Sequence, residues 1–136
     1  MKLINITNRF NIAVHAVLVL ASSDDLRSSV KEIAADLSIT QTYLTKVIQP
    51  LIKNDVIGTF RGKGGGILLK ADPTALTFLD IFDVIEGELD RDYCILDQKI
   101  CGSGHCLFNP FVAEANEKFI DMMRSYTVAA FIKKIS

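Results

Sequence analysis

The stretch from residue 29 to residue 70 constrains the fold of this chain more than any other part. Two short helical patterns are followed by an extended run, a glycine-rich turn with the sequence RGKGGG at residues 61–66, and a second extended run. This order is typical of a winged helix-turn-helix, in which one helix enters the major groove of DNA and a hairpin contacts the phosphates. We therefore expect a mainly α fold with a small β-hairpin.

The two helical patterns carry clear start signals. Ser29 and Glu32 form a capping box at the start of a helix over residues 30–37, and Thr40 is the expected N-cap of a second helix over residues 41–53. Pro50 predicts a kink or an irregular last turn in that second helix. Its apolar stripe consists of Leu44, Val47, Ile48 and Leu51.

Polar residues occupy the opposite face and the N-terminal end of the second helix. Amides and hydroxyls read the donor and acceptor pattern of base edges, and lysine binds guanine or phosphate. A solvated polar face is the alternative, and the neighbouring hairpin favours the DNA-binding interpretation. The candidate DNA-binding residues on this helix are Gln41, Thr42, Tyr43, Thr45 and Lys46.

The turn at residues 61–66 has the features of a wing between strands at residues 56–60 and 67–70. Its glycines Gly62, Gly64 and Gly65 let the backbone approach a sugar–phosphate chain without Cβ atoms in the way. Arg61 and Lys63 supply positive charge. A nucleotide-binding P-loop is excluded, because no lysine followed by serine or threonine closes the glycine run.

The charges are unevenly distributed along the 136 residues. The whole chain has a formal net charge of −1, but residues 40–70 carry a net +4 and residues 72–97 a net −7. A basic middle suits a phosphate backbone, and the acidic segment is a candidate docking surface. No nucleophile and base stand at a recognisable spacing, so an enzyme is not expected.

A strongly apolar helix is expected near the start of the chain, over residues 8–21. Thr7 or Asn8 can cap it, and His15 is expected as a packed or hydrogen-bonded core residue. A buried helix is favoured over a signal peptide, because polar residues interrupt the apolar run. No run is long enough to span a membrane, and a cytoplasmic protein is expected. The expected apolar face comprises Phe10, Val14, Val17, Leu18 and Ala21.

Residues 72–136 follow the wing and complete the chain. Thr77 is expected to cap a helix that ends at Gly87, and Asn109-Pro110 begins a long helix. Thr127 is expected to cap a last short helix. The long helix has an apolar stripe at Val112, Ala115, Phe119, Met122 or Met123, and Tyr126, which favours pairing between two chains over packing on its own domain. The predicted organisation is a winged helix-turn-helix at 1–87, a sensor loop at 88–108, and a dimerisation helix with a tail at 109–136.

The expected loop carries all three cysteines, Cys94, Cys101 and Cys106. Three thiolates on a glycine-containing loop can hold an iron–sulfur cluster with a fourth position open or filled by another ligand. Thiol redox sensing and simple packing are the alternatives. Zinc bound by three sulfurs and His105 is chemically allowed but less favoured.

The sequence resembles the Rrf-type family of bacterial transcriptional regulators, the relatives of IscR, NsrR and CymR. The resemblance covers nearly the whole chain and is most specific at the RGKGGG wing. It implies a homodimeric winged-helix transcription factor that binds operator DNA. It also implies a 2Fe–2S or 4Fe–4S cluster on the three cysteines, with Asn8 at the position of a known fourth ligand and His105 as a substitute.

The function expected from these patterns is a homodimeric repressor that senses iron–sulfur status, nitric oxide or redox state. A change at the loop would alter the spacing of the two DNA-reading helices, which must lie about 34 Å apart to meet successive major grooves. The alternative is a clusterless regulator of the same fold, controlled by thiol oxidation, a metabolite or a protein partner.

Overall fold

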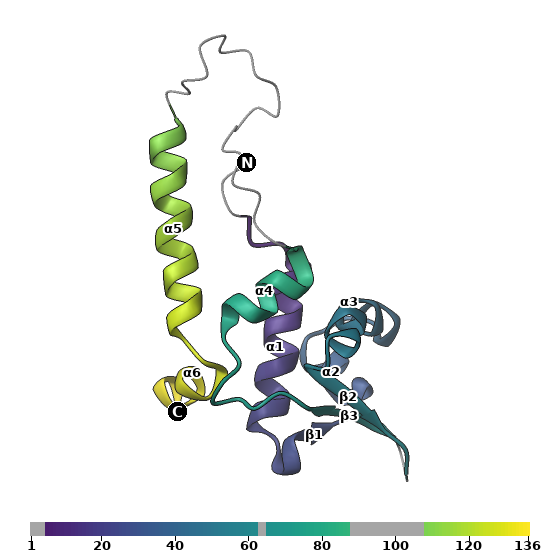
Figure 1. Cartoon of the computed structure of the whole chain (residues 1–136). Coiled ribbons are helices and arrows are strands. Elements are labelled where there is room, and N and C mark those ends of the chain that lie inside the picture. Colours follow the sequence, from purple (N-terminus) through teal and green to yellow (C-terminus); the bar gives the residue numbers. More distant parts are fainter. Residues whose placement is uncertain (1–4, 63–64, 88–107) are drawn as a thin grey trace.

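The computed structural model describes residues 5–62, 65–87 and 108–136. The fold is mainly α-helical with a small antiparallel sheet, as predicted, and the sheet lies beside the helical body (Figure 1). The elements are α1 (Asn8–Ser22), a short 3-10 turn (Asp24–Leu26), β1 (Arg27–Ser28), α2 (Val30–Asp36), α3 (Gln41–Lys53), β2 (Ile57–Phe60), β3 (Gly66–Leu69), α4 (Phe78–Glu86), α5 (Asn109–Ser125) and α6 (Val128–Ile135).

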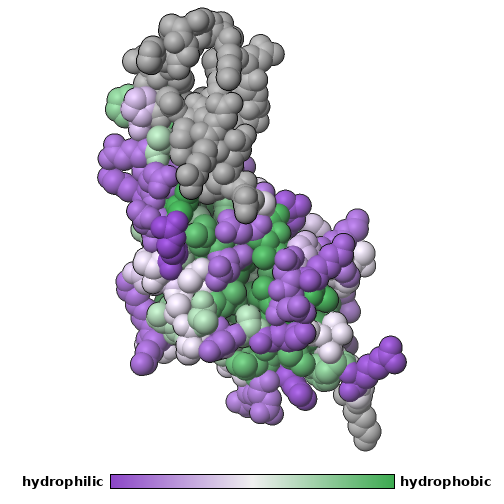
Figure 2. Space-filling model, in the orientation of Figure 1, coloured by the Kyte–Doolittle hydropathy of each residue, from purple (hydrophilic) through white to green (hydrophobic). Residues whose placement is uncertain are grey.

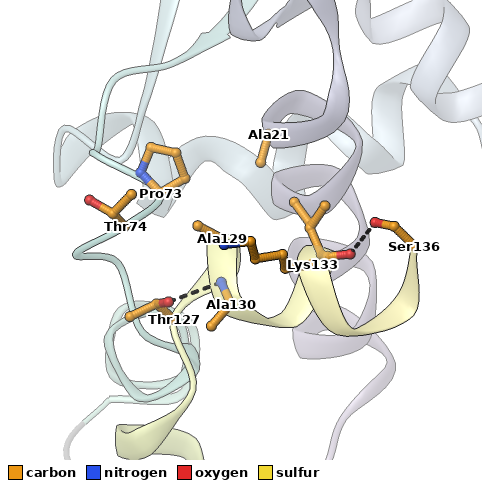
Figure 3. Close-up of a pocket in the computed structure, with 9 residues that line it drawn as sticks. Ala21, Pro73, Thr74, Thr127, Ala129, Ala130, Lys133 and Ser136 are labelled. Atoms are coloured by element: carbon orange, nitrogen blue, oxygen red, sulfur yellow. Dashed lines mark hydrogen bonds between the residues drawn. The ribbon is translucent and has the colours of Figure 1, made fainter.

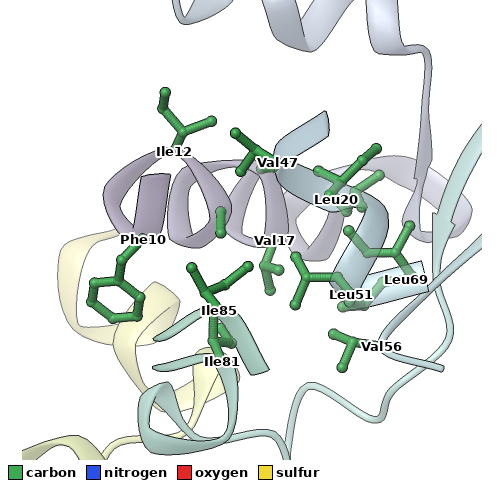
Figure 4. Close-up of a cluster of buried hydrophobic side chains, with 14 of the residues drawn as sticks. Phe10, Ile12, Val17, Leu20, Val47, Leu51, Val56, Leu69, Ile81 and Ile85 are labelled. Carbon is green, nitrogen blue, oxygen red and sulfur yellow. The ribbon is translucent and has the colours of Figure 1, made fainter. Parts of the chain in front are cut away.

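Helix α1 is the centre of the core. Thr7 caps it by accepting a hydrogen bond from the Phe10 N–H, and the helix contacts α3, α4, α6 and the sheet. The Phe10 ring also packs edge-on against Phe82 of α4, with centroids 5.2 Å apart. Figure 4 shows side chains of α1 meeting those of α3, α4 and β3. The buried residues of α1 are Phe10, Ile12, Ala13, Ala16, Val17 and Leu20.

The expected apolar face of α1 was therefore only partly right. Val14 and Leu18 are half-buried, while Ile12 and Leu20 are buried. His15 is not a core residue: it is exposed, and its Nδ1 lies 2.7 Å from the main-chain oxygen of Asn11. A helix that is apolar on most of its surface gives no unique stripe, so its orientation depends on the elements packed around it.

Helices α2 and α3 form the helix-turn-helix. The Ser29 hydroxyl accepts from the Glu32 N–H, as expected, but the Glu32 carboxylate accepts from the Ser28 hydroxyl at 3.2 Å instead of closing the capping box. Thr40 caps α3 through the Tyr43 N–H. Helix α3 continues through Pro50 to Lys53.

The sheet has three strands in the order β1-β3-β2, all antiparallel. Strands β2 and β3 are the two predicted arms of the hairpin. Strand β1 was not predicted, because its two residues are too short to show any alternation of polar and apolar side chains. Its register pairs Arg27 with Leu68 and Ser28 with Ile67, so it extends the hairpin on the β3 side.

A compact junction joins the start of α4 to the start of α6. Thr77 and Thr127 each cap a helix with a hydroxyl, as expected, and the two residues form an antiparallel bridge. Around the bridge, Phe78 N–H donates to the Tyr126 carbonyl at 3.2 Å and Val128 N–H to the Leu76 carbonyl at 2.8 Å. These main-chain bonds fix the end of α5 to the winged-helix body.

Helix α5 begins at Asn109-Pro110, as predicted, and extends away from α1–α3 (Figure 1). Its apolar stripe agrees with the expected one at Val112 and Met123, which are buried, and at Phe119 and Tyr126, which are half-buried. Ala115 is the exception, because it is exposed. Two large apolar residues of α5 face solvent, with Phe111 68% and Met122 60% exposed. They form an exposed apolar surface on the helix in the part of the chain that the structure describes.

Candidate nucleic-acid interface

Helix α3 presents a polar surface because its apolar side is buried in the core. Leu44, Val47, Ile48 and Leu51 are all 1% exposed or less. All five predicted DNA-binding residues of this helix are exposed, and they lie in its first two turns: Gln41, Thr42, Tyr43, Thr45 and Lys46. The Thr45 hydroxyl donates to the Gln41 carbonyl at 2.8 Å, which leaves its oxygen available as an acceptor.

The turn between α2 and α3 sets the position of this surface. Ser38 has a positive φ of 56°, and the Ile39 N–H donates to the Ala34 carbonyl at 3.0 Å. Ile33 and Ala34 are buried on the inner face of α2. The chain therefore reverses within a few residues, and Thr40 caps α3, whose first turn is exposed.

The hairpin turn lies at the end of β2 and β3. Arg61 is exposed and directly follows Phe60, the last residue of β2. The Gly65 N–H donates to the Gly62 carbonyl at 3.1 Å, and both glycines have positive φ, at 47° and 154°. Lys63 and Gly64 lie outside the described residues.

Helix α3 and the end of the hairpin lie on the same side of the body in Figure 1, opposite to α5 and α6. Within the described ranges, no ion pair involves Lys46 or Arg61, whereas Lys70 is paired with Asp55 at 3.1 Å. The arrangement thus combines a polar helix end with a hairpin cation on one side of the molecule.

The predicted cluster ligands Cys94, Cys101, Cys106 and His105 lie outside the described residues. Asn8 is described: it is exposed, and it is the first residue of α1. Its two neighbours contact the end of α4, since Thr7 donates to the Glu86 carboxylate and Arg9 to the Ile85 carbonyl at 3.1 Å. The start of α1 is therefore held against the end of α4. No group of histidine, cysteine or carboxylate side chains that could hold a metal ion occurs within residues 5–62, 65–87 and 108–136.

Helix α6 borders two cavities of about 560 Å³ each. One lies against Pro73 and the first turn of α6, where the Thr127 hydroxyl accepts from the Ala130 N–H (Figure 3). The other is lined mainly by aromatic and aliphatic residues of α1, α5 and α6, with Tyr126 and Lys134 at its polar side. The Lys134 ammonium donates to the Tyr126 hydroxyl at 3.0 Å, which lowers the pKa of the tyrosine and raises that of the lysine.

No helix in the described part of the chain is both long and apolar enough to span a bilayer.

The sequence matches one family model along almost its whole length. The model is described as Rrf2, iron-dependent transcriptional regulator, and it matches residues 6–134. The chain is also similar to the HTH-type transcriptional regulator NsrR of Bacillus subtilis strain 168. The two are 28% identical over 141 residues, which cover 98% of this chain and 91% of that protein.

Two solved structures share the fold. IscR of T. potens superposes with a TM-score of 0.75 at 22% identity, covering 98% of this chain and 89% of that one. The oxidized form of Staphylococcus aureus CymR superposes with a TM-score of 0.74 at 18% identity, covering 95% of this chain and 96% of that one. At these identities, the likeness concerns the fold alone.

Proposed function

Because the chain belongs to the Rrf2 family of transcriptional regulators, we propose that it is a cytoplasmic, homodimeric repressor that binds operator DNA and senses iron–sulfur status, nitric oxide or redox state. Membership of this family makes the chain a regulator of transcription and not an enzyme.

The observation that supports this proposal most strongly is that α3 and the end of the hairpin lie on the same side of the molecule. The exposed start of α3 offers amides, hydroxyls and a lysine, which are the groups that read base edges. Arg61 at the hairpin offers a guanidinium to the phosphates. A helix and a hairpin on one side of a body can contact adjacent grooves of the same duplex.

The exposed apolar residues of α5 and of its N-cap support a homodimer. Phe108, Phe111 and Met122 are 57%, 68% and 60% exposed in the single chain. Phe111 and Met122 are 11 positions apart, about three helical turns, so they lie on one face of α5. Exposed apolar surface on a long helix is typical of pairing with a second helix. Away from α5, Figure 2 shows further hydrophobic surface in the middle of the body, among polar side chains.

The donor set fits an iron–sulfur cluster. Cys94, Cys101 and Cys106 would supply three thiolates, the ligands that such clusters prefer. Asn8 is the first residue of α1, whose start is held against the end of α4, and it could supply an oxygen ligand. A bound cluster would provide a reactive centre for nitric oxide or oxidants, while Thr7 and Arg9 would keep α1 against the end of α4.

Control by thiol oxidation without a cluster is the second candidate function. It is favoured by the likeness to a CymR structure that was solved in an oxidized form. Exposed thiolates can form a disulfide or a sulfenic acid without any metal. The acidic segment 72–97 offers a third route, in which a partner protein or a metabolite controls the same fold.

The test has two independent readouts. Size-exclusion chromatography with light scattering measures whether the protein is a dimer. Fluorescence anisotropy with a pool of random duplexes of about 30 base pairs measures DNA binding. Purification under argon, followed by absorption spectra and iron and sulfide analysis, measures the cluster. We expect a DNA-binding dimer with visible absorbance that is lost in the Cys94→Ala variant.

The possible outcomes separate the candidates. A colourless dimer that binds DNA only when reduced supports thiol control. A colourless dimer whose DNA binding does not depend on redox state supports control by a partner or metabolite. A monomer that binds no duplex even at low salt contradicts the whole proposal.

A further inference from the structure

The small sheet has an inner and an outer face. Ile57, Ile67 and Leu69 are buried on the inner face. Because side chains alternate along a strand and directly paired residues share a face, Leu68 and Gly66 lie on the outer face together with their partners Arg27 and Phe60. This outer face is not covered by α1, which packs on the core side of the sheet.

Arg27 and Phe60 contact each other on this outer face. The guanidinium carbon of Arg27 lies 4.9 Å from the centroid of the Phe60 ring, which is a cation–π distance. The ring lies directly against Gly66, where an added Cβ would come within 2.9 Å of the Phe60 Cζ and 2.6 Å of the Ser28 oxygen. The glycine thus allows the ring to lie on the strand, and the ring supports the guanidinium.

The register shows where this cation is directed. Arg27 pairs with Leu68, but Phe60 pairs with Gly66, which is two residues and about 7 Å nearer to the hairpin turn. The Arg27 side chain therefore runs along the sheet toward the turn. Its charge is brought to the base of the hairpin, next to the residue that precedes Arg61.

Arg27 is also available to bind an anion. It is exposed, and no ion pair within residues 5–62, 65–87 and 108–136 involves it. Lys70 differs from Arg27 in this respect. Its side chain passes over Gly58 on the same outer face, and its ammonium forms an ion pair with Asp55 at 3.1 Å. One of the two cations is thus neutralised by a carboxylate and the other is held on an aromatic ring.

We propose that Arg27 is a further DNA-binding residue, whose guanidinium contacts a phosphate of the duplex beside the hairpin, and that Phe60 is its positioning residue. The inference rests on the proposed DNA-binding function. A guanidinium presents a planar fork of N–H donors that matches phosphate geometry, and a ring under its face leaves those donors free at the edge. A phosphate contact adds affinity for any sequence and does not select bases.

The experiment measures how the affinity for a random duplex pool of about 30 base pairs depends on salt, between about 50 and 200 mM KCl. In Arg27→Gln, we expect the slope of log K against log salt to fall by about 0.9 for each subunit, with a roughly three- to tenfold loss of affinity. Phe60→Leu keeps the charge but removes its support, so we expect a smaller loss in the same direction. Lys70→Gln is the matched control, and we expect its slope to equal that of the wild type.

Circular dichroism melting shows whether each variant is folded, and Arg27→Lys shows whether the charge alone suffices. Wild-type affinity and slope in folded Arg27→Gln would overturn the inference while leaving the DNA-binding function intact. An equal loss in Lys70→Gln would also overturn it, because the effect would then be one of overall charge. If the wild type binds no duplex, the proposed function fails and the inference fails with it.

Discussion

Thr77 and Thr127 face each other across an antiparallel bridge, and each also starts a helix with its own hydroxyl. The Thr77 hydroxyl accepts from the Asp80 N–H and the Thr127 hydroxyl from the Ala130 N–H, both at 3.1 Å. The two caps share one main-chain junction, so the start of α4 and the start of α6 are held together.

The first prediction concerns this junction. Thr127→Val keeps the shape of the side chain but removes the oxygen that accepts from Ala130, so we expect the free energy of unfolding to fall by about 1 kcal/mol. Thr127→Ser keeps the cap and should stay within a few tenths of a kcal/mol of the wild type. Urea denaturation followed by circular dichroism measures both, and equal midpoints for the valine variant and the wild type would contradict the prediction.

The second prediction concerns the contact between α1 and α4. Thr7 donates to the Glu86 carboxylate, and Arg9 lies 3.6 Å from the other carboxylate oxygen. The Glu86 side chain is only 17% exposed, so we expect Thr7→Val and Glu86→Gln to show a coupling energy of about 0.5–1.5 kcal/mol in a double-mutant cycle. Urea midpoints of the four proteins give that coupling.

Glu114 on α5 provides the matched control for this cycle. Its ion pair with Lys118 is 3.3 Å long and mostly exposed, so Glu114→Gln should change the free energy of unfolding by less than about 0.5 kcal/mol. Strict additivity of Thr7→Val and Glu86→Gln would mean that the contact contributes nothing to stability.

The third prediction is a pH dependence at Asp72. Its carboxylate accepts from the Thr74 hydroxyl at 2.7 Å and from the Thr74 N–H at 2.9 Å, which lowers its pKa below the ordinary value of 3.8. The folded state therefore favours the charged form, so its contribution to stability is present above the unfolded pKa and is lost as the pH falls through the folded pKa. We expect Asp72→Asn to be less stable than the wild type at neutral pH and equal to it in strong acid. A difference that does not change with pH would contradict this.

The fourth prediction concerns Arg61 at the hairpin. Arg61→Gln should weaken binding to all duplex sequences and reduce the slope of log K against log salt by about 0.9 for each subunit. Lys133→Gln removes a charge of the same sign from α6, on the opposite side of the body, and should leave the slope unchanged. Anisotropy titrations at several salt concentrations measure both variants. Identical slopes for Arg61→Gln and the wild type would remove the hairpin from the proposed interface.

Much of this fold was predictable because its helix starts are encoded locally. Thr7, Ser29, Thr40, Thr77 and Thr127 each cap the helix that the sequence assigned to them. A cap depends on a hydroxyl and an N–H three residues away, and both are visible in the sequence. The glycine-rich hairpin was predictable for a similar reason, since the glycines of residues 61–66 mark its turn directly in the sequence.

The features that were missed depend on distant partners. Strand β1 forms because it can pair with the edge of β3. The position of the Arg27 side chain depends on its contact with Phe60, which is distant in the sequence. His15 was expected in the core because its neighbours are apolar, but packing turned another face of α1 inward. The sequence left open whether Pro50 would kink the second helix or make its last turn irregular, and α3 runs through Pro50 to Lys53.

The junction between residues 72–78 and 126–129 has a consequence for how such a regulator can change over evolution. Gly87 ends α4, and Tyr126 is already bonded back to Phe78, so the intervening chain departs from and returns to two fixed points. A segment that is anchored at both ends can change in length or sequence without moving its two anchor points. Substitutions, insertions or deletions between Gly87 and the start of α5 can therefore accumulate while the winged-helix body keeps its shape.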